Sequence, residues 1–247
     1  MIKDYDKYEF TRLEFVQYLL KGILIALAIG ILFYRNILGV VLCIPIIIFY
    51  LRQKKEEAIK KRKIKLNMEF KEAVISLQGA LNSGYSIERA FTEILKDLSL
   101  IYKAESLIIK EVSYINNMIR MNQTVESALS DFAKRSKIED IMNFADIFVI
   151  SKRTGGNIIE IIQSTITNIN EKIEVDRDIR TLFASKVYES KIMELMPFIM
   201  IVYLSVFSPE FLKPLYHNAQ GVIIMTILLF VYFATFIWIN KILEIEI

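Results

Sequence analysis

Residues that build catalytic and metal centres are scarce in this chain, which has one cysteine and one histidine among its 247 residues. Cys43 lies inside an apolar run, so the sequence offers no disulfide framework and no thiolate metal site. His217 has no neighbouring nucleophile or carboxylate with which to act as a catalytic base, and we expect it at the surface. Glu139, Asp140 and Asp146 fall on one predicted helix, which we interpret as a solvated face. We therefore expect no enzyme activity, no metal and no cofactor.

Proline and glycine are scarce in the middle of the chain. Between residues 54 and 188 there is no proline, and the glycines are Gly79, Gly84, Gly155 and Gly156. Apolar residues recur there at spacings of three and four, and no run alternates convincingly with a period of two. This region is therefore predicted to be all-α, a bundle of about six helices.

Charge is nearly absent from four apolar blocks, and each block approaches the roughly 20 helical residues that cross a bilayer. The blocks are Ile23–Phe33, Ile37–Leu51, Ile192–Phe207 and Val222–Ile239. The first two are short and need flanking residues, or a thinner bilayer, in order to span it. The predicted transmembrane helices cover residues 18–34, 37–51, 191–208 and 221–240. They pair in sequence order as two transmembrane hairpins that flank the bundle.

Cations crowd the exit of the second block, whereas the links inside the two hairpins carry few. The crowded cations are Arg52, Lys54, Lys55, Lys60, Lys61, Arg62, Lys63 and Lys65. Because cytoplasmic loops carry the excess of Lys and Arg, this side of the membrane is predicted to be the cytoplasm. Anionic lipid headgroups explain the run without a nucleic-acid partner. The predicted segments are a cytoplasmic N-terminal segment (1–17), a transmembrane hairpin (18–51), a cytoplasmic helical bundle (52–190), a second hairpin (191–240) and a cytoplasmic tail (241–247).

Three breaks between predicted helices resemble one another, because in each a capping residue precedes an apolar helix. Ser86, Thr124 and Asn157 are the expected caps. In the third break the pair Gly155–Gly156 can adopt positive φ and end one helix. Glu160 stands three residues after Asn157, which is the spacing of a capping box. We expect stacked helical hairpins, with the last helix running on towards the third apolar block.

Two motifs, together with the charged helix that leads into the third apolar block, carry a family resemblance. The motifs are LQGALNSGYSIERAF at Leu77–Phe91 and SKRTGGNIIEII at Ser151–Ile162. Over roughly residues 65–240 the chain resembles bacterial type II secretion F domain proteins, in the single-domain form found in tight-adherence (Flp) pilus systems. The resemblance implies a non-enzymatic platform in the bacterial inner membrane. It also implies a cytoplasmic traffic ATPase, a second F-domain membrane protein and pilin subunits as partners, in a homo- or hetero-oligomer.

A helical protein without an active site acts through its surfaces, and loops held by a rigid scaffold are the usual binding points. We expect partner contacts at the last and the first of the three turns. The candidate residues are Arg153, Thr154, Gly155, Gly156, Asn157 and Glu160 at the last turn, and Gly84 and Ser86 at the first. The alternative, that these residues only shape the turns, stays open.

Glu194 and Pro197 lie in the third apolar block, where a carboxylate is costly and a proline removes a helix hydrogen bond. We interpret them as a membrane hinge or a contact with another subunit; the alternative is an interfacial Glu194 balanced by Lys191. The function that the chain and its resemblance indicate is coupling of the ATPase to pilin assembly or protein export. The alternative function is a membrane-anchored helical adaptor or regulatory protein that signals to a cytoplasmic partner.

Overall fold

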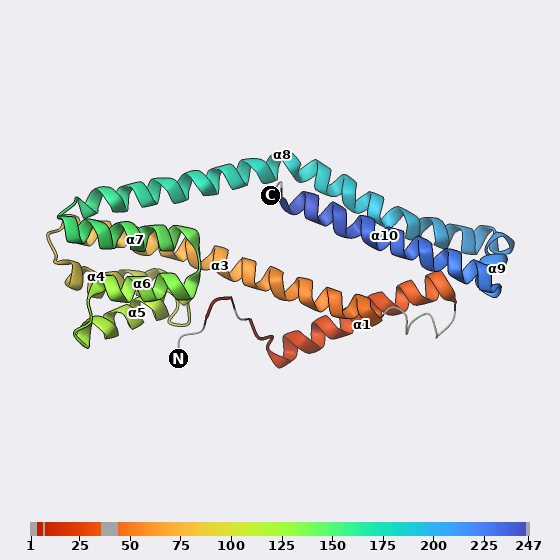
Figure 1. The fold of residues 1–247 in the computed structure, drawn as a ribbon, viewed down its shortest axis with the longest axis horizontal. Helices are drawn as coiled ribbons and strands as arrows, with labels where there is room; N and C mark the ends of the chain where they lie inside the picture. Colours follow the sequence, from red (N-terminus) through yellow and green to blue (C-terminus); the bar gives the residue numbers. More distant parts are fainter. Residues whose placement is uncertain (1–3, 7, 36–43, 246–247) are drawn as a thin grey trace. The chain divides into compact units, whose positions relative to one another are not determined.

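The computed structural model describes residues 4–6, 8–35 and 44–245, without the side chains of residues 180, 217, 219, 240 and 242–245. These residues form helices and no strand, which confirms the all-α prediction. The helices are α1 (Arg12–Tyr34), α3 (Ile44–Asn82), α4 (Ile87–Ile101), α5 (Leu107–Arg120), α6 (Val125–Ser136), α7 (Glu139–Thr154), α8 (Ile158–Phe207), α9 (Pro209–His217) and α10 (Ala219–Ile245) (Figure 1). The expected surface position of the His217 side chain, and part of the second predicted transmembrane helix (37–51), lie outside this description.

Contacts between the helices divide the chain into two compact units. Unit 1 consists of Met1–Glu9 and Lys55–Ile173, and unit 2 of Phe10–Lys54 and Glu174–Ile247. Two helices are shared, because α3 begins in unit 2 and ends in unit 1, and α8 does the reverse. Unit 1 stops before residue 190, where the predicted bundle ends, because the last fully buried side chain of α8 within it is Ile169.

Unit 1 is built around aromatic and aliphatic side chains that are shielded from water. Phe70 and Phe144 meet edge to face with their ring centroids 5.5 Å apart, and Phe144 lies 5.8 Å from Phe148. Burying a side chain of this size contributes about 1.5–3 kcal/mol. A void of about 20 Å³ in this core is lined only by apolar side chains, and it is too small for anything larger than a water molecule.

Successive helices of unit 1 run antiparallel, so the α3–α4, α5–α6 and α7–α8 turns lie at the same end of the unit (Figure 1). We call this the turn end. Each predicted cap accepts a backbone N–H from the helix that follows it. The accepting atoms are Ser86 Oγ (3.3 Å), Thr124 Oγ1 (3.2 Å) and Asn157 Oδ1 (3.1 Å). The three cap predictions are confirmed.

The break between α4 and α5 contains no glycine or proline, and it is not among the three predicted breaks. Ser106 caps α5 by accepting the N–H of Ile109 at 3.4 Å. The buried carboxylate of Glu69, on α3, accepts the N–H of Ile108 at 3.0 Å. A carboxylate at this position also stabilises the positive end of the helix dipole. A long-range contact from α3 therefore helps to begin α5.

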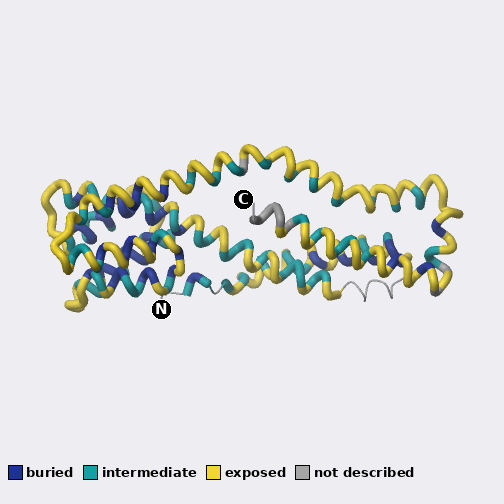
Figure 2. Tube along the Cα trace, turned by 45° about the horizontal axis from the view of Figure 1, so that its top comes forward, coloured by how far each residue is buried: buried dark blue, intermediate teal, exposed yellow. Residues whose placement is uncertain are grey.

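Within the described residues, three helices are long and apolar enough to cross a membrane, judged by length and composition. They are α1, the Thr181–Phe207 part of α8 and the Gln220–Ile239 part of α10. Exposed residues continue along α8 in Figure 2, and none of the most apolar stretch of Thr181–Phe207 is buried. Large outward apolar faces of this kind are consistent with the predicted membrane protein.

Inside unit 2 the helices contact one another both within and between the predicted hairpins, since Tyr34 of α1 also forms a hydrogen bond with Thr226 of α10 at 3.0 Å. Tyr232 of α10 donates its hydroxyl to the backbone carbonyl of Glu194 in α8 at 3.1 Å. The Tyr232 ring also meets Phe198 edge to face at a centroid distance of 5.1 Å. Gly22 of α1 faces the start of α3, because a Cβ added to Gly22 would lie 3.2 Å from Ile47 Cγ2. Thus α8 packs on α10, and α1 packs on the first residues of α3.

Candidate functional site

The α7–α8 turn is shaped by two glycines with different roles. Gly155 ends α7 in the left-handed conformation, at φ +72°, which residues with a Cβ adopt only at a cost. Gly156 donates its N–H to the carbonyl of Ser151 at 2.8 Å, and a Cβ on Gly156 would lie 3.2 Å from the Ser151 side chain. The shape of the backbone is sufficient to explain both of these candidate residues.

Asn157 begins α8 and satisfies its first amides. Its Oδ1 accepts the N–H groups of Ile159 and Glu160 at 3.1 and 3.4 Å. These are two of the donors that a helix N-terminus leaves without intrahelical partners. Glu160 does not complete the predicted capping box, because in the described part of the chain its carboxylate makes no hydrogen bond to the Asn157 N–H. The cap is therefore one-sided.

Lys152, in the last turn of α7, connects the three turns. Its Nζ lies 3.0 Å from the carboxylate of Glu126 and 3.6 Å from that of Glu88, in the first turns of α6 and α4. Burial alone would raise the pKa of Glu126, but its helix N–H and the Lys152 ammonium outweigh burial and hold this pKa below its usual value. The turn end is therefore one connected surface.

The first and last turns bring several predicted candidates to this surface. Gly84 adopts φ +84°, and a Cβ there would meet open space. Arg153 is exposed, whereas Thr154 donates its hydroxyl to the backbone carbonyl of Ile150 at 3.1 Å. Arg89 lies over the ring of Tyr85, with its guanidinium carbon 5.7 Å from the ring centroid. Arg153 is thus the candidate cation that the turn end presents outward.

An open hollow runs beside the turn end along the first turns of α8. Gln78 on α3 donates its Nε2 to Gln163 Oε1 on α8 at 2.6 Å, which joins the two helices there. The other side chains that line the hollow are mostly uncharged and polar, and they include the candidates Asn157 and Glu160. The arrangement offers hydrogen-bonding groups to a partner at the side of the turn end.

Glu194 and Pro197 lie inside α8, which runs through both positions without a break. The Glu194 side chain is half-buried and Pro197 is exposed. The contact of Glu194 with α10 is made by its backbone, because Tyr232 donates its hydroxyl to the Glu194 carbonyl. The structure therefore joins α8 to α10 here, and the hinge or subunit contact stays a prediction.

The three acidic residues of α7 have two different environments. Glu139 and Asp146 are exposed, as expected for a solvated face. Asp140 is different, because it accepts Asn67 Nδ2 at 2.8 Å and pairs with Lys172. The hydrogen bond to Asp140 raises the pKa of Lys172. The solvated-face prediction is therefore wrong for Asp140, which ties α3, α7 and α8 together. No group of three or more potential metal ligands gathers in the described part of the chain.

No family model, curated protein or solved structure matches the chain. The geometry alone makes the turn end the candidate site, because its paired charges and polar groups form a surface that suits contact with another protein. Lys152, Glu88 and Glu126 are not among the residues predicted from the sequence. Their only signal is general, since acidic residues favour first helical turns and basic residues favour last ones.

Proposed function

We propose that this chain is a non-enzymatic membrane platform of a bacterial type II secretion or tight-adherence pilus machine, and that its turn end binds a cytoplasmic traffic ATPase. The sequence motifs are the reason for choosing this family. The observation that supports coupling is α8, a single helix of 50 residues that leads from the α7–α8 turn into a segment of membrane-spanning length. At 1.5 Å per residue it is about 75 Å long. A continuous helix can pass a rigid-body displacement from one end to the other.

The two predicted hairpins are part of this proposal. The contact of Tyr232 with Glu194 supports pairing of α8 with α10, and the approach of Gly22 to Ile47 supports pairing of α1 with the start of α3. In the proposed topology the segment 37–51 crosses the membrane, which makes four spans. Unit 1 and both termini then lie in the cytoplasm, and the protein is a multi-pass protein of the inner membrane.

The outward apolar faces of unit 2 are the proposed contacts for lipid, pilin subunits and a second F-domain membrane protein. Support for this comes from the exposure of the Thr181–Phe207 part of α8. Glu194 and Pro197 are proposed as the hinge or subunit contact within that part. Oligomers, with copies of this chain or with the second F-domain protein, would form through the same faces.

Binding of the full chain, held in lipid nanodiscs, to the traffic ATPase of the same cell tests the proposal. Arg153→Glu reverses an exposed charge at the turn end and is expected to weaken binding roughly tenfold. Lys103→Glu is the matched control, because Lys103 is also exposed but lies in the α4–α5 break at the opposite end of unit 1. Its affinity is expected to equal that of the unchanged chain.

Both variants are checked for unchanged helical content by circular dichroism. Equal weakening by Arg153→Glu and Lys103→Glu would contradict the placement of the contact at the turn end. A well-folded chain that does not bind the ATPase at all would remove the platform proposal and favour the adaptor alternative.

A further inference from the structure

Three N-terminal residues, Asp4–Asp6, lie on unit 1 and form a segment that we call the strap. Tyr5 is 2% exposed, although it precedes α1 and lies outside any helix. Its hydroxyl donates to Glu111 Oε1 at 2.6 Å, across 106 positions of sequence. Its backbone N–H donates to the carbonyl of Arg135 at 3.2 Å. The strap is thus fixed to α5 and α6 by both its side chain and its backbone.

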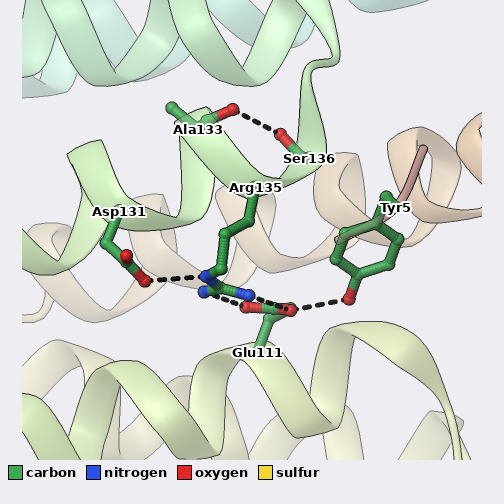
Figure 3. Close-up of polar contacts among 6 residues, drawn as sticks. All are labelled: Tyr5, Glu111, Asp131, Ala133, Arg135 and Ser136. Atoms are coloured by element: carbon green, nitrogen blue, oxygen red, sulfur yellow. Dashed lines mark hydrogen bonds and ion pairs between the residues drawn. The ribbon is translucent and has the colours of Figure 1, made fainter. Parts of the chain in front are cut away.

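The site that receives Tyr5, which we call the tyrosine socket, is built from charged side chains that are themselves paired. Glu111 is fully buried and accepts Nη1 and Nη2 of Arg135 at 2.8 and 2.7 Å. Figure 3 shows how Glu111 lies between Arg135 and Tyr5. Asp131 accepts Nε of the same guanidinium at 2.7 Å. Arg62 of α3 covers the Tyr5 ring, with its guanidinium carbon 4.7 Å from the centroid. Because a buried carboxylate needs several donors, the Tyr5 hydroxyl completes this network.

Asp6 adds ion pairs beside the socket. Its carboxylate pairs with Lys63 on α3 and, at 2.6 Å, with Lys137 at the end of α6. Hydrogen bonds from Lys137 and Lys63 hold the pKa of Asp6 below its usual value. Burial, together with the charge of Glu111, raises the pKa of Tyr5, so the phenol keeps the proton that it donates. Part of the basic run that follows the second apolar block is therefore neutralised within the chain.

We propose that unit 1 carries a binding site for a short acidic peptide that contains tyrosine, and that the strap is its intramolecular ligand. The strap leads through Glu9 into α1, so an occupied socket gives α1 an attachment to unit 1 in addition to the continuous helices α3 and α8. Release of the strap removes this attachment and opens the Glu111–Arg135 pair to water. Occupancy of the socket thus switches α1 between a tethered and an untethered state.

Binding in trans tests whether the socket is a site. A labelled peptide of residues 1–10 is added to a chain that lacks residues 1–9, held in nanodiscs, and fluorescence anisotropy is measured. Saturable binding is expected, and it should weaken at least tenfold when the peptide carries Tyr5→Ser or the chain carries Lys137→Glu. Absence of saturable binding to a truncated chain with normal helical content would overturn the proposal.

Hydrogen exchange in the full chain tests the same proposal without truncation. Lys137→Glu places a like charge opposite Asp6, and it is expected to speed exchange of the Tyr5 amide at least tenfold. Lys134→Glu changes the net charge equally at an exposed position on the same helix and is expected to leave this amide unchanged. Equal exchange rates in the two variants would overturn the proposal. A dimer that dissociates when the strap is deleted would place the strap of a second copy in the socket and overturn the intramolecular assignment.

Discussion

Unit 1 and unit 2 are both helical, but unit 1 buries its large apolar side chains, whereas unit 2 exposes many of its own. Among the described residues, the twelve largest fully buried side chains, such as Phe132 and Phe144, all belong to unit 1. In unit 2, Phe230 and Trp238 are 75% and 74% exposed. Removal of apolar surface from water therefore accounts for the packing of unit 1, whereas the outward apolar faces of unit 2 are consistent with a lipid surrounding.

The two units also satisfy their polar groups differently. Unit 1 buries an ion pair, Glu111 with Arg135, together with the hydroxyl of Tyr5. Unit 2 uses hydroxyl groups that bond to backbone carbonyls, such as Tyr232 to Glu194 and Tyr216 to Leu32. Hydroxyl contacts of this kind join helices in lipid without burying a charge. Substitutions matched across the two units can therefore test whether the helices are stabilised by different means.

The largest difference is expected when an aromatic ring is removed from each unit. Phe144→Ala should lower the free energy of unfolding of unit 1 by about 3–5 kcal/mol, because it leaves a cavity beside Phe70 and Phe148. Phe230→Ala removes the same atoms from an outward position and should change stability by no more than about 0.5 kcal/mol. Denaturant unfolding of the full chain in micelles, followed by circular dichroism, measures both. Equal losses would contradict the assignment of the two units to different solvents.

Polar contacts should show a smaller difference in the same direction. Arg135→Leu leaves Glu111 buried without its charge partner and should cost unit 1 about 3 kcal/mol. Tyr232→Phe removes one hydroxyl contact from unit 2 and should cost about 0.6 kcal/mol. The same unfolding experiment compares the two. The double change Arg135→Leu with Glu111→Leu should recover more than half of the first loss, and a double variant as unstable as Arg135→Leu would show that the lost pairing is not the cause.

Two glycines of unit 1 should respond to alanine with opposite signs. Gly155→Ala forces a Cβ into the left-handed region and should lower the free energy of unfolding by about 1 kcal/mol. Gly79→Ala lies in α3, where a Cβ would meet open space, and should raise it by about 0.5–1 kcal/mol. Thermal unfolding gives both values. A stabilising Gly155→Ala would remove the backbone explanation for this residue.

The smallest expected effect concerns the Lys152 contact at the turn end. Because the pKa of Glu126 is held below its usual value of 4.5, its stabilisation is complete above that value and is lost as the pH falls through the lower pKa of the folded state. Glu126→Gln should therefore be less stable than the unchanged chain by less than about 1 kcal/mol at pH 7, and equal to it in strong acid. Unfolding curves at a series of pH values test this. A gap that persists unchanged into strong acid would show that the ion pair is not its source.

Local features of the structure could be predicted from the sequence, because they depend on residues close together in the chain. The caps Ser86, Thr124 and Asn157 follow from a capping side chain placed just before an apolar helix. The apolar blocks follow from composition alone. The α4–α5 break was missed because Ser106 has no glycine near it and the break depends in part on Glu69, far away in α3.

Contacts between distant residues could not be predicted, and they make up most of the candidate site and all of the socket. Tyr5 stands among acidic and basic residues, a pattern typical of a solvated segment, and its partner Glu111 is 106 positions away. Lys152 pairs with acidic residues on two other helices. Asp140 looked solvated because its partners lie on α3 and α8. Which charges meet is decided by the packing of the bundle, and no spacing in the sequence indicates it.

The proposed topology places unit 1 on one side of a membrane and both hairpin links on the other. Single cysteines at Arg35, Lys103 and Lys213, each in a Cys43→Ser background, test it by labelling with a membrane-impermeant maleimide. In the proposed topology, Arg35→Cys and Lys213→Cys react in spheroplasts, whereas Lys103→Cys reacts only after the membrane is opened. If Arg35→Cys reacted only after opening, together with Lys103→Cys, the segment 37–51 would not cross the membrane, and the proposed four-span topology would be contradicted.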